Sequence, residues 1–135
     1  MDLIGMFKNL ENALDAASLR QQVIANNIAN ASAPGFQSQG VAFEDELKKA
    51  MDDKDASEGL GGMRAVSLDE EDGDFRIGGN RPEDVRAKVF NTGQNADMNK
   101  EMVNLSKNQI HYNMLADKLG GFMGAVQMVI DNTGK

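Results

Sequence analysis

The sequence predicts a mainly α-helical fold in which long helices at the two chain ends pack as an antiparallel, coiled-coil-like pair. A small irregular or β segment lies between them. Two heptad patterns, one at each terminus, are the main reason for this prediction. The composition agrees, because only 5% of the residues are aromatic and none is Trp, so a core must come from aliphatic residues and methionine. A chain of 135 residues needs only one domain.

The first heptad pattern predicts a long helix within residues 1–33. Eight of nine positions spaced alternately four and three residues apart are apolar, and the exception is Gln21. At about 1.5 Å per residue this helix is roughly 43 Å long, so it needs a partner helix to cover its apolar stripe. The nine positions are Leu3, Phe7, Leu10, Leu14, Ala17, Gln21, Ile24, Ile28 and Ala31.

The second heptad pattern predicts the partner helix within residues 97–135. Asp97 is a suitable N-cap, and Asn132-Thr133-Gly134 a suitable stop. If the helices pack antiparallel, Gln21 and Gln109 meet and set the register, as single polar residues do in coiled coils. Nine of the ten positions are apolar: Met98, Met102, Leu105, Gln109, Tyr112, Ala116, Leu119, Met123, Val126 and Ile130.

The middle segment, residues 34–96, has a different character. The spacing of four apolar residues predicts a short amphipathic helix, and the charged, glycine-containing stretch 52–62 predicts a loop or mobile insert. Three short alternating runs predict a small β element, with the acidic turn 69–74 between the first two. The helix positions are Phe43, Leu47, Ala50 and Met51, and the alternating runs are 65–68, 75–77 and 85–89.

Three asparagines crowd the end of the N-terminal pattern. Asn26, Asn27 and Asn30 are poor helix-interior residues, because their amides compete for backbone hydrogen bonds. One interpretation is that they bind backbone groups locally or across an interface, and the other is simple helix termination. Pro34-Gly35 then fits the centre of a type II turn.

Composition and charge exclude several function classes. The absence of cysteine removes disulfides and thiolate chemistry, and a single histidine, His111, cannot build a histidine cluster for a metal. We therefore expect no catalytic site, metal or cofactor. The net charge of the chain is −7. Residues 44–74 have a net charge of −8, so the remainder is close to neutral, and no basic stripe for nucleic acid is present. The chain start lacks the pattern of a cleavable signal peptide, and no stretch predicts a membrane-spanning helix.

Five methionines lie on more than one face of the C-terminal pattern. Methionine adapts to irregular neighbours, so this helix either contacts several partners at once or uses methionine as ordinary core filling. The five are Met98, Met102, Met114, Met123 and Met128.

With these motifs in place, the chain resembles the flagellar axial proteins, the family of rod, hook and junction subunits, and most of all the proximal rod subunits. The matching segments are 14–21, 23–30 and 34–36, followed by Phe43-Glu44, and at the other end 97–102 leading to Lys107-Asn108 and Tyr112. The resemblance does not extend over residues 52–94.

The resemblance implies a structural subunit of the flagellar basal-body rod, exported through the flagellar type III apparatus and polymerised in the periplasm. Its expected partners are copies of itself, neighbouring rod proteins, the export apparatus and the base of the basal body. The alternative is a soluble coiled-coil adaptor or secretion-system binding module that forms closed oligomers. The expected interface residues are the two heptad patterns and the turn segment: Leu3, Phe7, Leu10, Leu14, Gln21, Ile24, Asn26, Asn27, Ile28, Asn30, Pro34, Gly35, Phe36, Met98, Met102, Leu105, Gln109, Tyr112, Leu119, Met123, Val126 and Ile130.

Overall fold

The computed structural model describes residues 3–59, 66–68, 75–77 and 85–134. Its elements follow one another as three helices and four short strands. In chain order they are α1 (Leu3–Asn30), β1 (Gln37–Ala42), α2 (Glu44–Gly59), β2 (Val66–Leu68), β3 (Phe75–Ile77), β4 (Lys88–Asn95) and α3 (Met98–Thr133).

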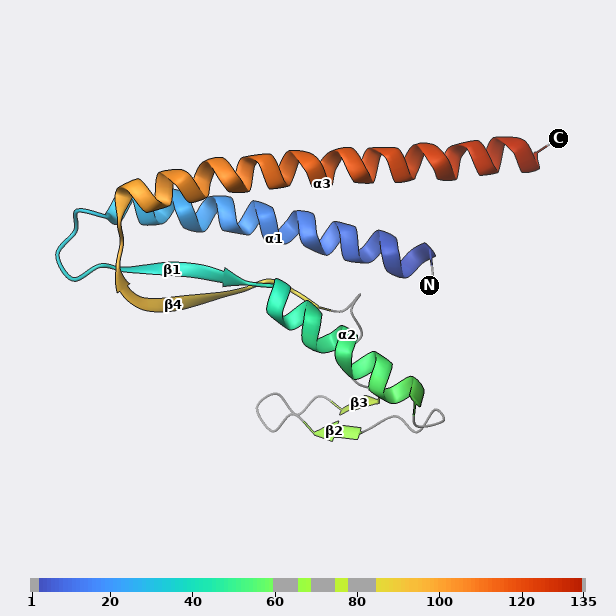
Figure 1. Cartoon of the computed structure of the whole chain (residues 1–135), viewed down its shortest axis with the longest axis horizontal. Helices are drawn as coiled ribbons and strands as arrows, with labels where there is room; N and C mark the ends of the chain where they lie inside the picture. Colours follow the sequence, from blue (N-terminus) through green and yellow to red (C-terminus); the bar gives the residue numbers. More distant parts are fainter. Residues whose placement is uncertain (1–2, 60–65, 69–74, 78–84, 135) are drawn as a thin grey trace.

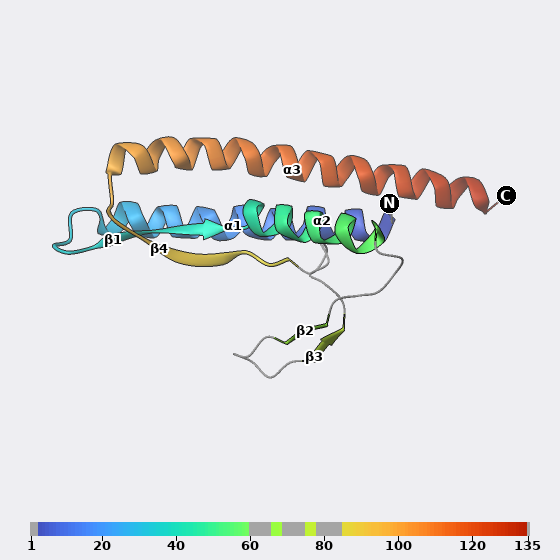
Figure 2. The ribbon, with the colours of Figure 1, turned by 60° about the horizontal axis from the view of Figure 1, so that its bottom comes forward.

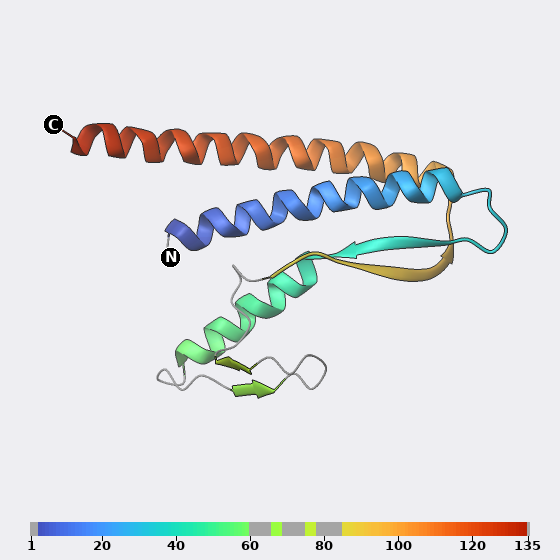
Figure 3. The same ribbon diagram turned by 180° about the vertical axis from the view of Figure 1, so that it is seen from behind.

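The helix α1 lies between two neighbours. On one side α3 runs antiparallel to it, and on the other side lies the two-stranded ribbon of β1 and β4 (Figure 1). The helix α2 leaves the end of β1 and points away from the ribbon, toward the β2–β3 hairpin (Figures 1 and 3). Seen after a 60° turn, α3 still forms a separate outer layer (Figure 2). The predicted mainly α fold with antiparallel terminal helices is confirmed.

Two contacts along the helix pair establish its antiparallel register. Near the start of α1, the ring of Phe7 lies 6.0 Å from that of Phe122, measured between ring centroids. Near the middle of α1, the Asn108 amide donates a hydrogen bond of 2.9 Å to the Ala17 carbonyl. Because α3 has 36 residues and α1 only 28, the C-terminal end of α3 continues past the start of α1 (Figure 1).

A small apolar core joins α1 to the middle segment. Ala16, Phe43, Ala50 and Val85 are all buried and pack together. Alanine at position 16 lets α2 and the chain before β4 approach the α1 backbone closely. Three acidic residues in the first turn of α2, beginning with Glu44, favour its N-terminus through the helix dipole.

The local signals for turns and caps in the sequence are confirmed. The Asp97 side chain accepts hydrogen bonds from the N–H groups of Asn99 and Lys100, and α3 stops at Thr133. Gly35 has a φ of 73°, and the Phe36 N–H donates to the Ala33 carbonyl, as a type II turn with Pro34 at its first central position requires.

The middle segment departs from the sequence prediction in three ways. The stretch after residue 51 is helical up to Gly59, because charged residues are compatible with an exposed helix as well as with a loop. The third alternating run begins as a strand only at Lys88, three residues later than expected. Its partner is β1, which we did not predict. The β2–β3 pair is confirmed, and the acidic turn 69–74 lies outside the described residues.

Candidate assembly interface

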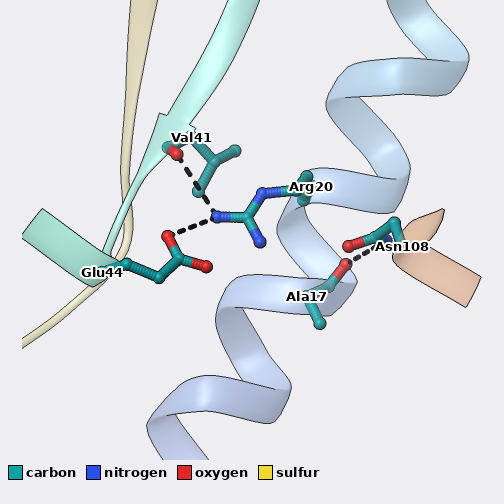
Figure 4. Close-up of polar contacts among 5 residues, drawn as sticks. All are labelled: Ala17, Arg20, Val41, Glu44 and Asn108. Atoms are coloured by element: carbon teal, nitrogen blue, oxygen red, sulfur yellow. Dashed lines mark hydrogen bonds and ion pairs between the residues drawn. The ribbon is translucent and has the colours of Figure 1, made fainter. Parts of the chain in front are cut away.

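Side chains from α1 take the place of a third strand along the outer edge of β1. The Asn27 amide donates a 2.8 Å hydrogen bond to the Gln39 carbonyl, and the Gln39 N–H donates one of 2.9 Å to the Asn27 amide oxygen. One residue pair further along this edge, the Arg20 guanidinium donates to the Val41 carbonyl at 3.4 Å (Figure 4). Because an uncapped strand edge invites pairing with another chain, these contacts protect β1 and fix the ribbon on α1.

Asn27 is the asparagine that distinguishes the two interpretations of the Asn-rich segment. Its side chain is only 1% exposed, and both of its polar groups are used. By contrast, the Asn30 amide donates to the Asn26 carbonyl at 2.8 Å within the last turn of α1, where Asn26 is exposed. The interpretation that these asparagines bind backbone groups is confirmed within the chain for Asn27 and Asn30. Their contact with other molecules stays a prediction.

Arg20 also forms an ion pair with Glu44, at the first turn of α2. The distance from Nη2 of Arg20 to Oε2 of Glu44 is 2.8 Å (Figure 4). Partial burial opposes ionisation of the carboxyl group, but the hydrogen bond from Arg20, a backbone hydrogen bond, and the charges of Arg20 and His111 outweigh burial. They hold the pKa of Glu44 below its ordinary value of 4.5. One arginine therefore connects α1, β1 and α2.

The polar centre of the α1–α3 interface is built around Asn108, which is 4% exposed. Its amide nitrogen donates to the Ala17 carbonyl and, at 3.1 Å, to the Gln21 side-chain oxygen. The predicted meeting of Gln21 with Gln109 is therefore wrong by one residue. Gln109 is exposed and donates to Asn113 on its own helix instead.

The side of α3 that packs on α1 also differs from the predicted stripe. Of the predicted positions, only Leu105, Leu119 and Val126 are half-buried, while Met98, Met102, Tyr112, Met123 and Ile130 are at least 40% exposed. An apolar residue was available on several sides of α3, so the pattern alone did not single out the correct side. The buried and half-buried residues of α3 are Glu101, Asn104, Leu105, Asn108, His111, Leu115, Leu119, Phe122 and Val126.

The N-terminal stripe is placed as predicted along its central part. Ala17 and Ile24 are buried, and Phe7, Leu10, Leu14, Gln21 and Ile28 are half-buried. Leu3 is 58% exposed, because it lies at the first turn of α1. In the turn, Pro34 and Gly35 are exposed and Phe36 is half-buried.

Among the residues that the structure describes, two hollows lie along the helix pair. A groove of about 700 Å³ between α1, the ribbon and the start of α3 is lined by polar and charged residues such as Arg20, Lys107 and His111. At the opposite end, an apolar hollow of about 320 Å³ is lined by Leu3, Ile4, Phe7, Phe122, Met123, Val126 and Gln127. The second hollow is an uncovered continuation of the α1–α3 contact.

The polar groove shows no arrangement for catalysis. His111 lines the groove and is half-buried. Ser106 lies outside this lining, and its hydroxyl group donates to the Met102 carbonyl of its own helix. In the part of the chain that the structure describes, no three acidic, histidine or cysteine residues gather where they could hold a metal ion. In the same part, none of the helices has the length and apolar character needed to cross a membrane.

Comparison with known proteins identifies the chain's family. A family model for flagella basal body rod proteins matches residues 7–37, the segment that contains Arg20 and Asn27. The flagellar basal body rod protein FlgB of Bacillus subtilis is 31% identical over 126 residues, which cover 93% of each chain. The chain belongs to the FlgB family of flagellar basal body rod proteins. FlgB of Borrelia hermsii (35% over 120 residues, 87% of this chain and 89% of the relative) and of Yersinia enterocolitica (30% over 139 residues, 95% of each) agree.

Membership confirms the main functional prediction. This rod protein is a structural component of the flagellar basal body, associated with other basal body components, and not an enzyme. Sequence reasoning missed three residues that organise the structure: Arg20, Ser38 and Asn108. Each acts through a contact distant in sequence, as in the 2.6 Å hydrogen bond between the hydroxyl groups of Ser38 and Thr92. Only the unusual number of Asn and Gln within the helical patterns hinted at such contacts.

Proposed function

We propose that this rod protein polymerises through its terminal helices, with copies of itself and neighbouring rod proteins, into the proximal part of the rod. In that position it forms part of the drive shaft that transmits torque and encloses the export channel. We propose further that it reaches the periplasm through the flagellar type III apparatus.

The observation that carries this proposal is the apolar surface that α3 leaves uncovered. Nine of its large apolar side chains are more than 45% exposed, among them Met102, Ile110 and Ile130. Covering one such side chain stabilises an assembly by about 1.5–3 kcal/mol. Several neighbouring subunits packed around α3 would bury this surface.

The free end of the helix pair supports the same proposal. The α3 segment beyond the start of α1 has Met128, Val129 and Ile130 exposed at 75%, 64% and 57%. With the adjacent apolar hollow, it forms an end surface that a neighbour can cover. A rigid shaft needs such contacts, because a close-packed interface resists relative motion of its subunits. The interface residues expected from the sequence belong to this proposal.

The test uses hook-basal bodies purified from the source organism and from a strain that lacks this chain. We expect the rod protein in the purified structures and no rod in the deletion strain. Finding the protein only in the soluble fraction, with rods intact in the deletion strain, would establish the closed-oligomer adaptor instead.

A point variant sharpens this test by separating assembly from folding. Ile130→Asp places a charge on the exposed end of α3, where the isoleucine is 57% exposed. We expect normal helix content by circular dichroism but loss of motility and of the protein from basal bodies. Asn132→Asp, which adds the same charge at an exposed polar position two residues away, is the control and should remain motile.

A further inference from the structure

Two hydrogen-bond acceptors on α3 are buried along the polar groove without a donor. Glu101 is 8% exposed and Asn108 is 4% exposed, and both line the groove between α1, the ribbon and the start of α3. Buried polar groups in folded proteins are nearly always hydrogen-bonded, and a buried charge is normally paired with an opposite charge. The carboxylate of Glu101 and the side-chain oxygen of Asn108 therefore need donors that enter the groove.

The orientation of the Asn108 amide is fixed by α1. Its nitrogen donates to the Ala17 carbonyl at 2.9 Å and to the Gln21 side-chain oxygen at 3.1 Å (Figure 4). Because the Ala17 carbonyl can only accept, exchanging the nitrogen and oxygen of the amide would place two acceptors against each other. The Asn108 oxygen is thus held on the other side of the amide, where it is buried and accepts no hydrogen bond within the described residues.

The cations that line the groove do not pair with Glu101. Among the described residues, neither ion pair includes Glu101, and no side chain donates to its carboxylate. Arg20 already donates to β1 and α2. Lys100 and Lys107 are one and six residues from Glu101 along α3, and these spacings do not bring side chains of a helix together. His111 is ten residues away, which is about 15 Å along the helix.

The spacing of the two acceptors describes the partner that would satisfy them. Glu101 and Asn108 are seven residues apart, so they lie on the same side of α3, about 10 Å from each other along its axis. One side chain cannot serve both. A second helix running along the groove presents residues seven apart with the same spacing. The carboxylate needs a lysine or arginine, and the amide oxygen needs any N–H or O–H donor.

A copy of this chain does not offer such a helix. In its own helices, only three pairs place a lysine or arginine seven residues from a second donor side chain. In each pair, at least one member is bonded within the chain or lines the groove itself. Subunits that assemble head to tail contact one another through different surfaces, so groove residues of a copy cannot fill the groove. The pairs are Arg20 with Asn27, Lys100 with Lys107, and Lys118 with His111.

We infer that, in the assembled rod, the polar groove binds a helix of a different rod protein. This helix places a lysine or arginine against the Glu101 carboxylate and a second donor against the Asn108 oxygen. The inference rests on the proposed function and adds to it. Exposed apolar side chains give a contact that many neighbours can make, whereas a buried carboxylate discriminates against a neighbour that brings no cation. The groove therefore selects which protein lies beside this subunit.

The first test is a cryo-EM structure of purified hook-basal bodies at a resolution that shows side chains. We expect a helix of another rod protein in the groove, with a lysine or arginine nitrogen within about 4 Å of the Glu101 carboxylate. A groove that holds only water, a carboxylate bound by the chain's own Lys100 or Lys107, or a groove occupied by a copy of this chain would each overturn the inference.

The second test reverses the charge of Glu101 in the flagellated organism. Glu101→Lys places like charges together, so we expect the amount of the variant in purified basal bodies to fall at least about tenfold. Glu11→Lys makes the same change at an exposed position of α1 and should stay within about twofold of the parent. Changing the partner's basic residue, once the map has shown it, to glutamate should restore assembly of Glu101→Lys.

The restoration separates a contact between subunits from a role of Glu101 in folding. A variant that fails only because its own chain is disturbed is not restored by any change in another protein, and that result would overturn the inference. The proposed function is judged separately, by the presence of the parent chain in basal bodies and the loss of rods without it. Parent chain in the rod with Glu101 unpaired would leave the proposed function standing and remove only the inference.

Discussion

The junction of α1 with β1 is held together by polar contacts within the chain, whereas the outer side of α3 presents exposed apolar side chains. At the junction, the buried Asn27 binds Gln39, and the half-buried Arg20 binds Val41 and Glu44, all within the chain. On the outer side of α3, apolar side chains such as Ile110 and Met128 are mostly exposed. Directional hydrogen bonds define the arrangement of one subunit, while non-directional apolar surface remains for contacts with others.

This contrast explains why the two long helices are not interchangeable. The helix α1 is covered on two sides, so its residues mainly determine how the subunit folds. The helix α3 is covered on one side and has only three buried residues, Glu101, Asn108 and Leu115. Substitutions at the junction should therefore alter the stability of the free chain, and substitutions on the outer side of α3 should alter association.

The largest effect on free-chain stability is expected for Asn27→Ala. It removes both hydrogen bonds to the Gln39 backbone and leaves the edge of β1 without its cap at that residue. We expect the free energy of unfolding to fall by about 1–3 kcal/mol, measured by urea denaturation. Gln22→Ala, at an exposed position of the same helix, should change it by no more than about 0.5 kcal/mol. Equal effects of the two substitutions would mean that the Asn27 contacts do not stabilise the junction.

Two glycine-to-alanine substitutions test the contrast, because they should change the free energy of unfolding in opposite directions. Gly35→Ala places a Cβ at a φ of 73° and should destabilise the chain by about 1 kcal/mol. Gly121→Ala lies in the middle of α3 with open space around it and should stabilise the free chain by up to about 1 kcal/mol. Both values come from the same thermal or urea titration. A destabilising Gly121→Ala would show that this glycine serves the fold of the subunit itself.

The same contrast explains which features the sequence could predict. The long helices, the Asp97 cap and the Pro34-Gly35 turn depend on neighbouring residues, and all were predicted correctly. The side of α3 that meets α1 was not, because α3 is apolar on several sides and the contact uses Asn108. The strand β1 was missed because Gln37–Ala42 is largely polar and its partner, β4, lies about fifty residues away. At the junction, the crowding of asparagines pointed to Asn26, Asn27 and Asn30 together without distinguishing Asn27, and Arg20 was passed over because its contacts are all distant in the chain.

The smallest expected effect concerns the ion pair at the edge of the junction. Because the pKa of Glu44 in the folded chain is below 4.5, the folded state binds fewer protons there than the unfolded state. The resulting stabilisation is complete above about pH 4.5 and is lost as the pH falls through the lowered pKa. Glu44→Gln should remove this dependence, so the difference in urea midpoint between parent and variant should shrink from pH 6 to pH 3. Since the Glu44 side chain is 58% exposed, added salt should reduce the difference at pH 6. A difference that is independent of both pH and salt would mean that Glu44 contributes through packing and not through its charge.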